Sequence, residues 1–91
     1  MTVLSLAARL DLPAAGPLAA AVSARGGKDL TLDAGGVCHL GGLGLQVLLA
    51  SARQWRETGH VLRIAPRSAA FDEALGLFGV GLDSLEAEGA A

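Results

Sequence analysis

The chain has 91 residues, of which 52% are hydrophobic and 3% aromatic, and its seven basic and nine acidic side chains give a net charge of −2. A chain of this length forms one small domain. It has no Lys/Arg cluster and no tyrosine, so the residues that usually contact phosphates and stack on bases are missing, which argues against a nucleic-acid surface. The single cysteine, Cys38, excludes an internal disulfide.

The sequence also predicts where in the cell the protein is located. No apolar run reaches the ~18–20 residues that a membrane-spanning helix needs. The N-terminal segment MTVLSLAARLDL has no charged leader before its apolar stretch, unlike a signal peptide. We therefore expect a cytoplasmic protein with no direct membrane insertion.

The first third of the chain predicts a strand followed by a helix. Residues 2–6 are β-branched and aliphatic and indicate a strand, which residues 9–11 are expected to continue after a bend. A helix is expected from Leu12-Pro13 to about Arg25. Pro17 is unfavourable inside a helix, so either it still lies in the first turn or the helix begins near Gly16. The buried face of this helix is expected to contain Leu18, Ala21 and Val22.

The middle of the chain predicts a strand, a helix and a strand. Gly26-Gly27 is a helix stop, and residues 28–33 indicate a strand with Leu30 and Leu32 on one face. The strongest helix pattern covers residues 42–58 and ends at Gly59. At 100° per residue, one sector of this helix, with Trp55 at its edge, contains Leu45, Leu48, Leu49 and Ala52. Residues 61–65 are apolar enough for a central strand.

The last third predicts a helix and a tail. Ser68 is expected to cap a helix that runs through Leu77 and buries Phe71, Leu75 and Phe78. Residues 83–91 are small and acidic and are expected to fray outside a domain of residues 1–82. The alternation of strands and helices predicts an α/β domain, with three to four helices covering a mixed, partly parallel sheet of about four strands.

Short motifs occur in order along nearly the whole chain: Leu10-Asp11, Asp33-x-x-x-Val37, Gly44-Leu45 and Phe78-Gly79-Val80. Together they resemble the STAS family, the anti-sigma-factor-antagonist type of domain. That family usually carries Asp-Ser-x-Gly-Leu at the start of the middle helix, and a partner kinase phosphorylates the serine. Glycine stands here at both the acid position, Gly41, and the serine position, Gly42. The resemblance thus implies a STAS fold with no phosphoacceptor at Gly42.

The sequence gives little support for a catalytic site or a metal site. Cys38 and His39 are adjacent, and neighbouring residues on an extended chain point to opposite sides, so they are not expected to act as a nucleophile and its base. We interpret Cys38 as a small buried apolar residue and His39 as a loop residue at a contact surface. One cysteine and two histidines are too few for a metal site. The acidic residues are interpreted as solvated or capping, so we expect no enzyme and no cofactor.

The glycine-rich loop allows two interpretations. Its glycines could cradle a phosphate at a helix start, but the loop lacks the Lys-Ser/Thr of a P-loop and the spacing of a dinucleotide fingerprint. We interpret it as a tight turn that needs positive φ, and an anion or nucleotide site stays open as the alternative. The glycines concerned are Gly35, Gly36, Gly41, Gly42 and Gly44.

The face of the 42–58 helix opposite its apolar sector has few charges. It contains Leu43, Gln46, Val47, Ala50 and Gln54, with Leu43 and Val47 adjacent at i, i+4. A contact with another copy, or scattered surface apolar residues, would also explain this face. We interpret it as part of a protein-binding site, and the helix and loop are where the resemblance places a docked kinase. The predicted partner-binding residues are Asp11, His39, Gly41, Gly42, Leu43, Gln46, Val47 and Ala50.

The function expected from these observations is protein–protein interaction in bacterial signal transduction. The chain is expected to be a non-enzymatic regulator that binds a signalling kinase of the chemotaxis or anti-sigma type. The loop from His39 to Leu43 is most similar to that of small STAS proteins associated with bacterial chemotaxis kinases. Two alternatives stay open: an accessory subunit of a lipid-transport ATPase, and an anion- or nucleotide-binding module. A homodimer is also compatible with the sequence.

Overall fold

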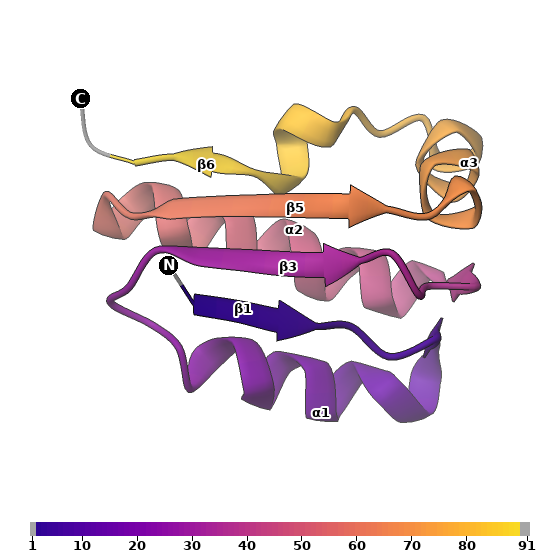
Figure 1. The fold of residues 1–91 in the computed structure, drawn as a ribbon, viewed down its shortest axis with the longest axis horizontal. Helices are drawn as coiled ribbons and strands as arrows, with labels where there is room; N and C mark the ends of the chain where they lie inside the picture. Colours follow the sequence, from indigo (N-terminus) through magenta and orange to yellow (C-terminus); the bar gives the residue numbers. More distant parts are fainter. Residues whose placement is uncertain (1, 90–91) are drawn as a thin grey trace.

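The computed structural model describes residues 2–89 and has a mixed α/β fold (Figure 1). The main sheet has the strand order β1 (Thr2–Ser5), β3 (Leu30–Ala34), β5 (Val61–Arg67) and β6 (Ala87–Glu88). The first three strands are parallel, and β6 pairs with β5 in the antiparallel direction. The helices are α1 (Leu12–Ser23), α2 (Gly42–Thr58), α3 (Ala69–Phe78) and the 3-10 helix η1 (Leu82–Leu85). The predicted fold class is confirmed.

The strands β3 and β5 and the helix α2 form the centre of the core. Alternate residues of the two strands face α2, which lies behind the sheet in Figure 1, and are buried: Leu30, Leu32, Ala34, Leu62 and Ile64. The predicted α2 stripe is also buried at Leu45, Leu48, Ala52 and Trp55, and Leu49 is half-buried. The Trp55 indole Nε1 donates to the Lys28 carbonyl oxygen at 2.8 Å, which satisfies the one polar group of that side chain. The predicted bounds and orientation of α2 are confirmed.

Residues 9–11 do not continue the first strand, as the sequence pattern suggested. β2 (Arg9–Leu10) pairs with β4 (His39–Leu40) in a separate parallel two-stranded sheet. The chain turns after Leu6, and the Ala8 carbonyl then accepts from the amides of Cys38 and His39 at 2.7 and 3.1 Å. These hydrogen bonds satisfy the backbone of the turn and fix the segment before α1 against the segment before α2.

The helix α1 begins at Leu12, with Pro13 in its first turn. Pro17 lies inside the helix, so both alternatives proposed from the sequence are wrong. Proline has no N–H, so the carbonyl of residue 13 loses its usual i+4 donor, and the proline ring crowds the same carbonyl. Leu18 and Val22 are buried, and α1 packs against α2 and β2, which compensates for the missing bond.

The helix α3 begins as predicted and ends differently. The Ser68 Oγ accepts from the Phe71 amide at 3.0 Å, which is the expected N-cap, and Phe71 and Leu75 are buried. Phe78 was expected to be buried with them and is 45% exposed. It lies in the last turn of α3, a helix at one end of the molecule (Figure 1), where the described chain covers that side chain only in part.

The C-terminal segment is ordered through residue 89, so the predicted fraying from Asp83 is wrong for residues 83–89. Leu85 and Ala87 are buried in the core. The guanidinium Nη2 of Arg56 donates to three carbonyl oxygens of this segment, those of Asp83, Ser84 and Glu86, each at 3.0 Å. The small, acidic sequence suggested a tail because the contacts that hold this segment, to Arg56 and to β5, are long-range and leave no local pattern. Residues 90–91 lie outside the described residues.

The remaining strand and helix bounds differ from the sequence expectation by at most two residues at either end. β5 is longer than predicted because it continues pairing with β3 through Pro66 after a register shift. Within residues 2–89, no helix combines the length and apolar character needed to cross a membrane.

Candidate functional site

The short β2–β4 ladder brings the segment around Asp11 next to the glycine loop. The Gly41 amide donates to the Leu10 carbonyl at 2.9 Å. A Cβ on Gly41 would lie 3.6 Å from both the Asp11 Cα and the His39 Nε2. Figure 1 shows α1 and α2 starting at the same end of the molecule, where the parallel strands β1, β3 and β5 also end. Three of the predicted site residues, Asp11, His39 and Gly41, are therefore close together.

The start of α2 presents backbone without side chains. Gly41 is the N-cap residue, with φ −88° and ψ 170°, and no side chain caps the helix there. Gly42 is the first helical residue, and a Cβ added to it would meet no atom within 4 Å. The position that corresponds to the family's serine thus faces open space. A side chain would fit there, but this chain has none.

The loop glycines are not required for positive φ, so that interpretation of the sequence is wrong. Among residues 2–89, the glycines with positive φ are Gly27, Gly59, Gly79 and Gly89, all outside the loop. Gly44 is required for space instead, and Gly35 is tightly packed. A Cβ on Gly44 would lie 2.5 Å from the Leu10 carbonyl oxygen, and one on Gly35 would lie 3.1 Å from the Pro66 Cγ. Gly44 lets α2 begin in direct contact with β2.

The outward face of α2 divides into two parts. Leu43, Gln46 and Ala50 are exposed, as predicted. Val47 was expected to point away from the core, but it is half-buried and packs against the core cluster. The reason is α1, which packs against α2 and leaves a shallow groove of about 150 Å³ between the two helices, lined by Ala19, Ser23, Val47, Ala50, Ser51 and Gln54. A charge at Val47 would therefore disturb the fold as well as the surface.

Cys38 is exposed, so its interpretation as a buried apolar residue is wrong. Its neighbours Val37 and Leu40 are buried instead, because they are the residues that point inward from the turn and from β4. His39 is exposed, in agreement with a surface role. Across residues 2–89, no three His, Cys, Asp or Glu side chains are grouped so that they could hold a metal ion.

Exposed apolar side chains occur in the segments that meet at the glycine loop. The described chain has five large hydrophobic side chains that are exposed, and four of them are near the loop: Leu12 (72%), Leu43 (42%), Leu77 (91%) and Phe78 (45%). Leu12 follows Asp11, and Leu43 follows the glycine pair at the start of α2. Leu77 and Phe78 line a groove of about 290 Å³ with Cys38 and His39, between α3 and β4.

We call this region the loop-end surface and define it as Asp11, Leu12, His39, Gly41, Gly42, Leu43, Leu77 and Phe78. Sequence reasoning missed Leu12, Leu77 and Phe78. A sequence signal existed for Leu77, which lies off the helical stripe that Phe71 and Leu75 define. A leucine at that position is apolar where solvent alone favours a polar residue.

The comparisons with known proteins identify the domain. The family model described as "Mlab, STAS domain" matches residues 1–85. Searches of curated proteins and of solved structures found no significant match. The matched range includes both short strands, the glycine loop, the three α-helices and η1. The chain belongs to the STAS domain family.

Proposed function

We propose that this STAS protein is a non-enzymatic regulator that binds a signalling kinase, of the chemotaxis or anti-sigma type, through the loop-end surface and the exposed part of α2. The observation that carries the proposal is that four exposed apolar side chains occur in the segments that meet at the glycine loop: Leu12, Leu43, Leu77 and Phe78. Membership of the STAS family suggests a regulatory, anti-sigma-antagonist-like role, and the family is generally non-enzymatic.

The chemistry of this surface suits a protein partner. Covering a leucine or phenylalanine side chain completely contributes about 1.5–3 kcal/mol, so a partner that buries several of them gains substantial binding free energy. Gly41 and Gly42 have no side chains, which lets a partner backbone approach the start of α2 closely. Gln46 and Ala50 are exposed and extend the surface along α2. Val47 is half-buried and lines the groove between α1 and α2 together with Ala50.

The charges near the loop favour a protein over a free anion. The Asp11 backbone lies beside the loop, and its carboxylate pairs with the Arg9 guanidinium, whose Nε is 3.1 Å from Oδ2. Because the carboxylate and the guanidinium neutralise each other, this pair offers no net positive charge to hold an anion or nucleotide at the α2 start. At a protein interface, an exposed pair of this kind lies on the rim and contributes more to orientation than to affinity. A nucleotide titration that detects no binding is the expected result.

The proposed regulator lacks the family's phosphorylation switch. Gly42 supplies no hydroxyl at the serine position, and the nearest hydroxyl along α2, that of Ser51, is buried and donates to the Val47 carbonyl at 2.7 Å. Phosphate adds about two negative charges, which can release a partner from such a surface. We therefore expect partner binding that phosphorylation at this position does not control.

Two matched measurements test these points. The chain is immobilised beside its Leu43→Glu variant, and the captured host proteins are identified by mass spectrometry. A kinase captured by the parent chain and lost by the variant supports the proposal. A transport ATPase captured in the same way would support the accessory-subunit alternative and overturn the kinase assignment.

The second measurement concerns the switch. The parent chain and its Gly42→Ser variant are incubated with the captured kinase and ATP, and their intact masses are compared. We expect phosphate on the variant alone, since the added Cβ has open space around it. Stoichiometric phosphate on the parent chain would contradict unregulated binding.

A further inference from the structure

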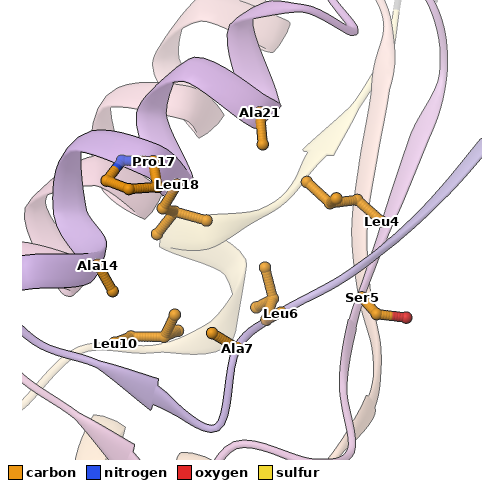
Figure 2. A pocket seen from close by; sticks show the side chains of 9 residues that line it. All are labelled: Leu4, Ser5, Leu6, Ala7, Leu10, Ala14, Pro17, Leu18 and Ala21. Atoms are coloured by element: carbon orange, nitrogen blue, oxygen red, sulfur yellow. The ribbon is translucent and has the colours of Figure 1, made fainter.

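A pocket of about 170 Å³, open to solvent on one side, lies between α1 and the N-terminal strands. Figure 2 shows its two walls: α1 on one side, and the chain from β1 to β2 on the other. The lining residues are Leu4, Ser5, Leu6, Ala7, Leu10, Ala14, Pro17, Leu18 and Ala21. β1 is an edge strand of the main sheet, and α1 packs on α2 and β2, so the space between α1 and β1 stays unfilled.

The lining of the cavity is apolar. None of its side chains is charged, and the one polar side chain, that of Ser5, points away from the space in Figure 2. The side chains of Leu4, Leu6 and Leu10 approach from the strand side, and those of Leu18 and Pro17 lie on the helix side. A polar or charged ligand would lose its water there and find no side-chain partner in exchange.

Small residues on α1 create the space. Ala14 and Ala21 are two helical turns apart and lie on the same face of the helix, above and below Leu18. Larger side chains at these positions would extend into the cavity. An apolar cavity left empty loses packing contacts, so a hydrocarbon that fills it would gain them.

We propose that this cavity is a binding site for a small neutral hydrocarbon of about the size of a six-carbon ring. An enclosed apolar cavity of roughly 150 Å³ takes up benzene, which sets the size of the ligand. This pocket has a similar volume but opens to solvent on one side, so a bound ring would keep one edge exposed. The proposal does not rest on the proposed kinase binding, because none of the lining residues belongs to the loop-end surface or to α2. The pocket does adjoin the loop through Leu10, whose carbonyl accepts from the Gly41 amide at 2.9 Å.

The test uses the full chain with isotope-labelled leucine methyl groups and benzene as the probe. We expect a saturable titration, with intermolecular NOEs from benzene to the methyl groups of Leu4, Leu6, Leu10 and Leu18. No NOE is expected to Leu77, which is the most exposed leucine of the described chain. NOEs spread over exposed leucines, or no binding at all, would overturn the proposal.

Two cavity-filling variants make the assignment specific. Ala21→Leu and Ala14→Leu each place a larger side chain in the space, and each is expected to weaken benzene binding at least tenfold. Ala20→Leu makes the same change at an exposed position of α1 and should bind as the parent chain does. Circular dichroism identifies the variants that fold. If a folded cavity variant binds benzene as tightly as Ala20→Leu, the cavity is not the binding site.

Discussion

Two leucines of α2 occupy contrasting regions of the molecule. Leu48, in the middle of the helix, is 1% exposed and packs against the sheet, whereas Leu43, in the first turn, is 42% exposed at the loop-end surface. The two residues have the same side chain and lie on one helix, so composition and propensity do not explain the difference. Burial depends on what packs over each position. The same distinction separates Phe71, which is buried, from Phe78 on α3. Apolar residues in the core stabilise the fold, and those at the loop end are available for binding.

The largest loss of stability is expected from a substitution in the core. Leu48→Ala removes a fully buried side chain between α2 and the sheet, and we expect a loss of about 2–5 kcal/mol in the free energy of unfolding. In a domain of this size such a loss is a large fraction of the total stability. Urea denaturation monitored by circular dichroism measures it. A loss well below 1 kcal/mol would show that Leu48 is not packed as described.

The next effect concerns the contact that joins the two short strands to α2. Gly44→Ala would place a Cβ 2.5 Å from the Leu10 carbonyl oxygen and 2.9 Å from the Leu10 Cβ, so backbone must move. We expect a loss of about 1–3 kcal/mol, as for other substitutions that overpack a well-filled site. Denaturation of Gly44→Ala and Gly42→Ala under the same conditions gives the comparison. Equal stability of the two variants would show that the β2–α2 contact adapts without cost.

The sequence predicted the fold well where burial produces a regular pattern. The α2 helix has an apolar stripe over several turns, and its bounds and buried face were predicted correctly because each turn repeats the same signal. The short strands β2 and β4 have two residues each, too few for any periodicity. The C-terminal segment is held by β5 and by Arg56, which is distant in the sequence from the carbonyl groups that it binds. Such long-range hydrogen bonds have no local sequence signal.

The candidate site was predicted in part for similar reasons. The resemblance and the glycine pattern located Asp11, His39, Gly41, Gly42 and Leu43, and the structure places the residues of this group around one loop. A helical wheel takes no account of neighbouring helices or of where a helix ends, and this led to the wrong predictions for Val47 and Phe78. Val47 is half-buried because a second helix packs beside it, and Phe78 is exposed because its helix ends there. Neither fact is contained in the spacing of apolar residues.

The third prediction concerns Leu43, the exposed leucine of the two compared above. Leu43→Glu places a charge on the loop-end surface, where an unpaired charge under a bound partner loses its hydration. We expect kinase binding to weaken at least tenfold, which corresponds to about 1.4 kcal/mol. The variant should remain folded, because Leu43 is exposed and a carboxylate in the first turn of a helix is favourable. Calorimetric titration with the captured kinase and a thermal melt measure the two properties.

The control for Leu43→Glu is Ala20→Glu, which makes the same change in net charge at an exposed position of α1 outside the loop-end surface. It should bind the kinase as the parent chain does. Loss of binding in both variants would indicate a general electrostatic effect. Unchanged binding in a folded Leu43→Glu variant would remove Leu43 from the interface and leave the α3–β4 groove, with Leu77 and Phe78, as the surface to test.

The smallest change in the free energy of unfolding is expected at Gly42, two residues before Gly44. This change should be a gain in stability rather than a loss. A Cβ at Gly42 meets no atom within 4 Å, and the residue is helical, so alanine can adopt the native backbone without strain. Gly42→Ala also restricts the unfolded chain, and we expect a gain of about 0.4–1 kcal/mol in the free energy of unfolding. If a partner approaches the bare backbone at the start of α2, the same methyl group should weaken its binding even as the fold becomes more stable. A thermal melt and a kinase titration on one sample separate these two effects. A variant that is less stable than the parent chain would mean that Gly42 is required by the fold, and the start of α2 would then belong with the core rather than with the binding surface.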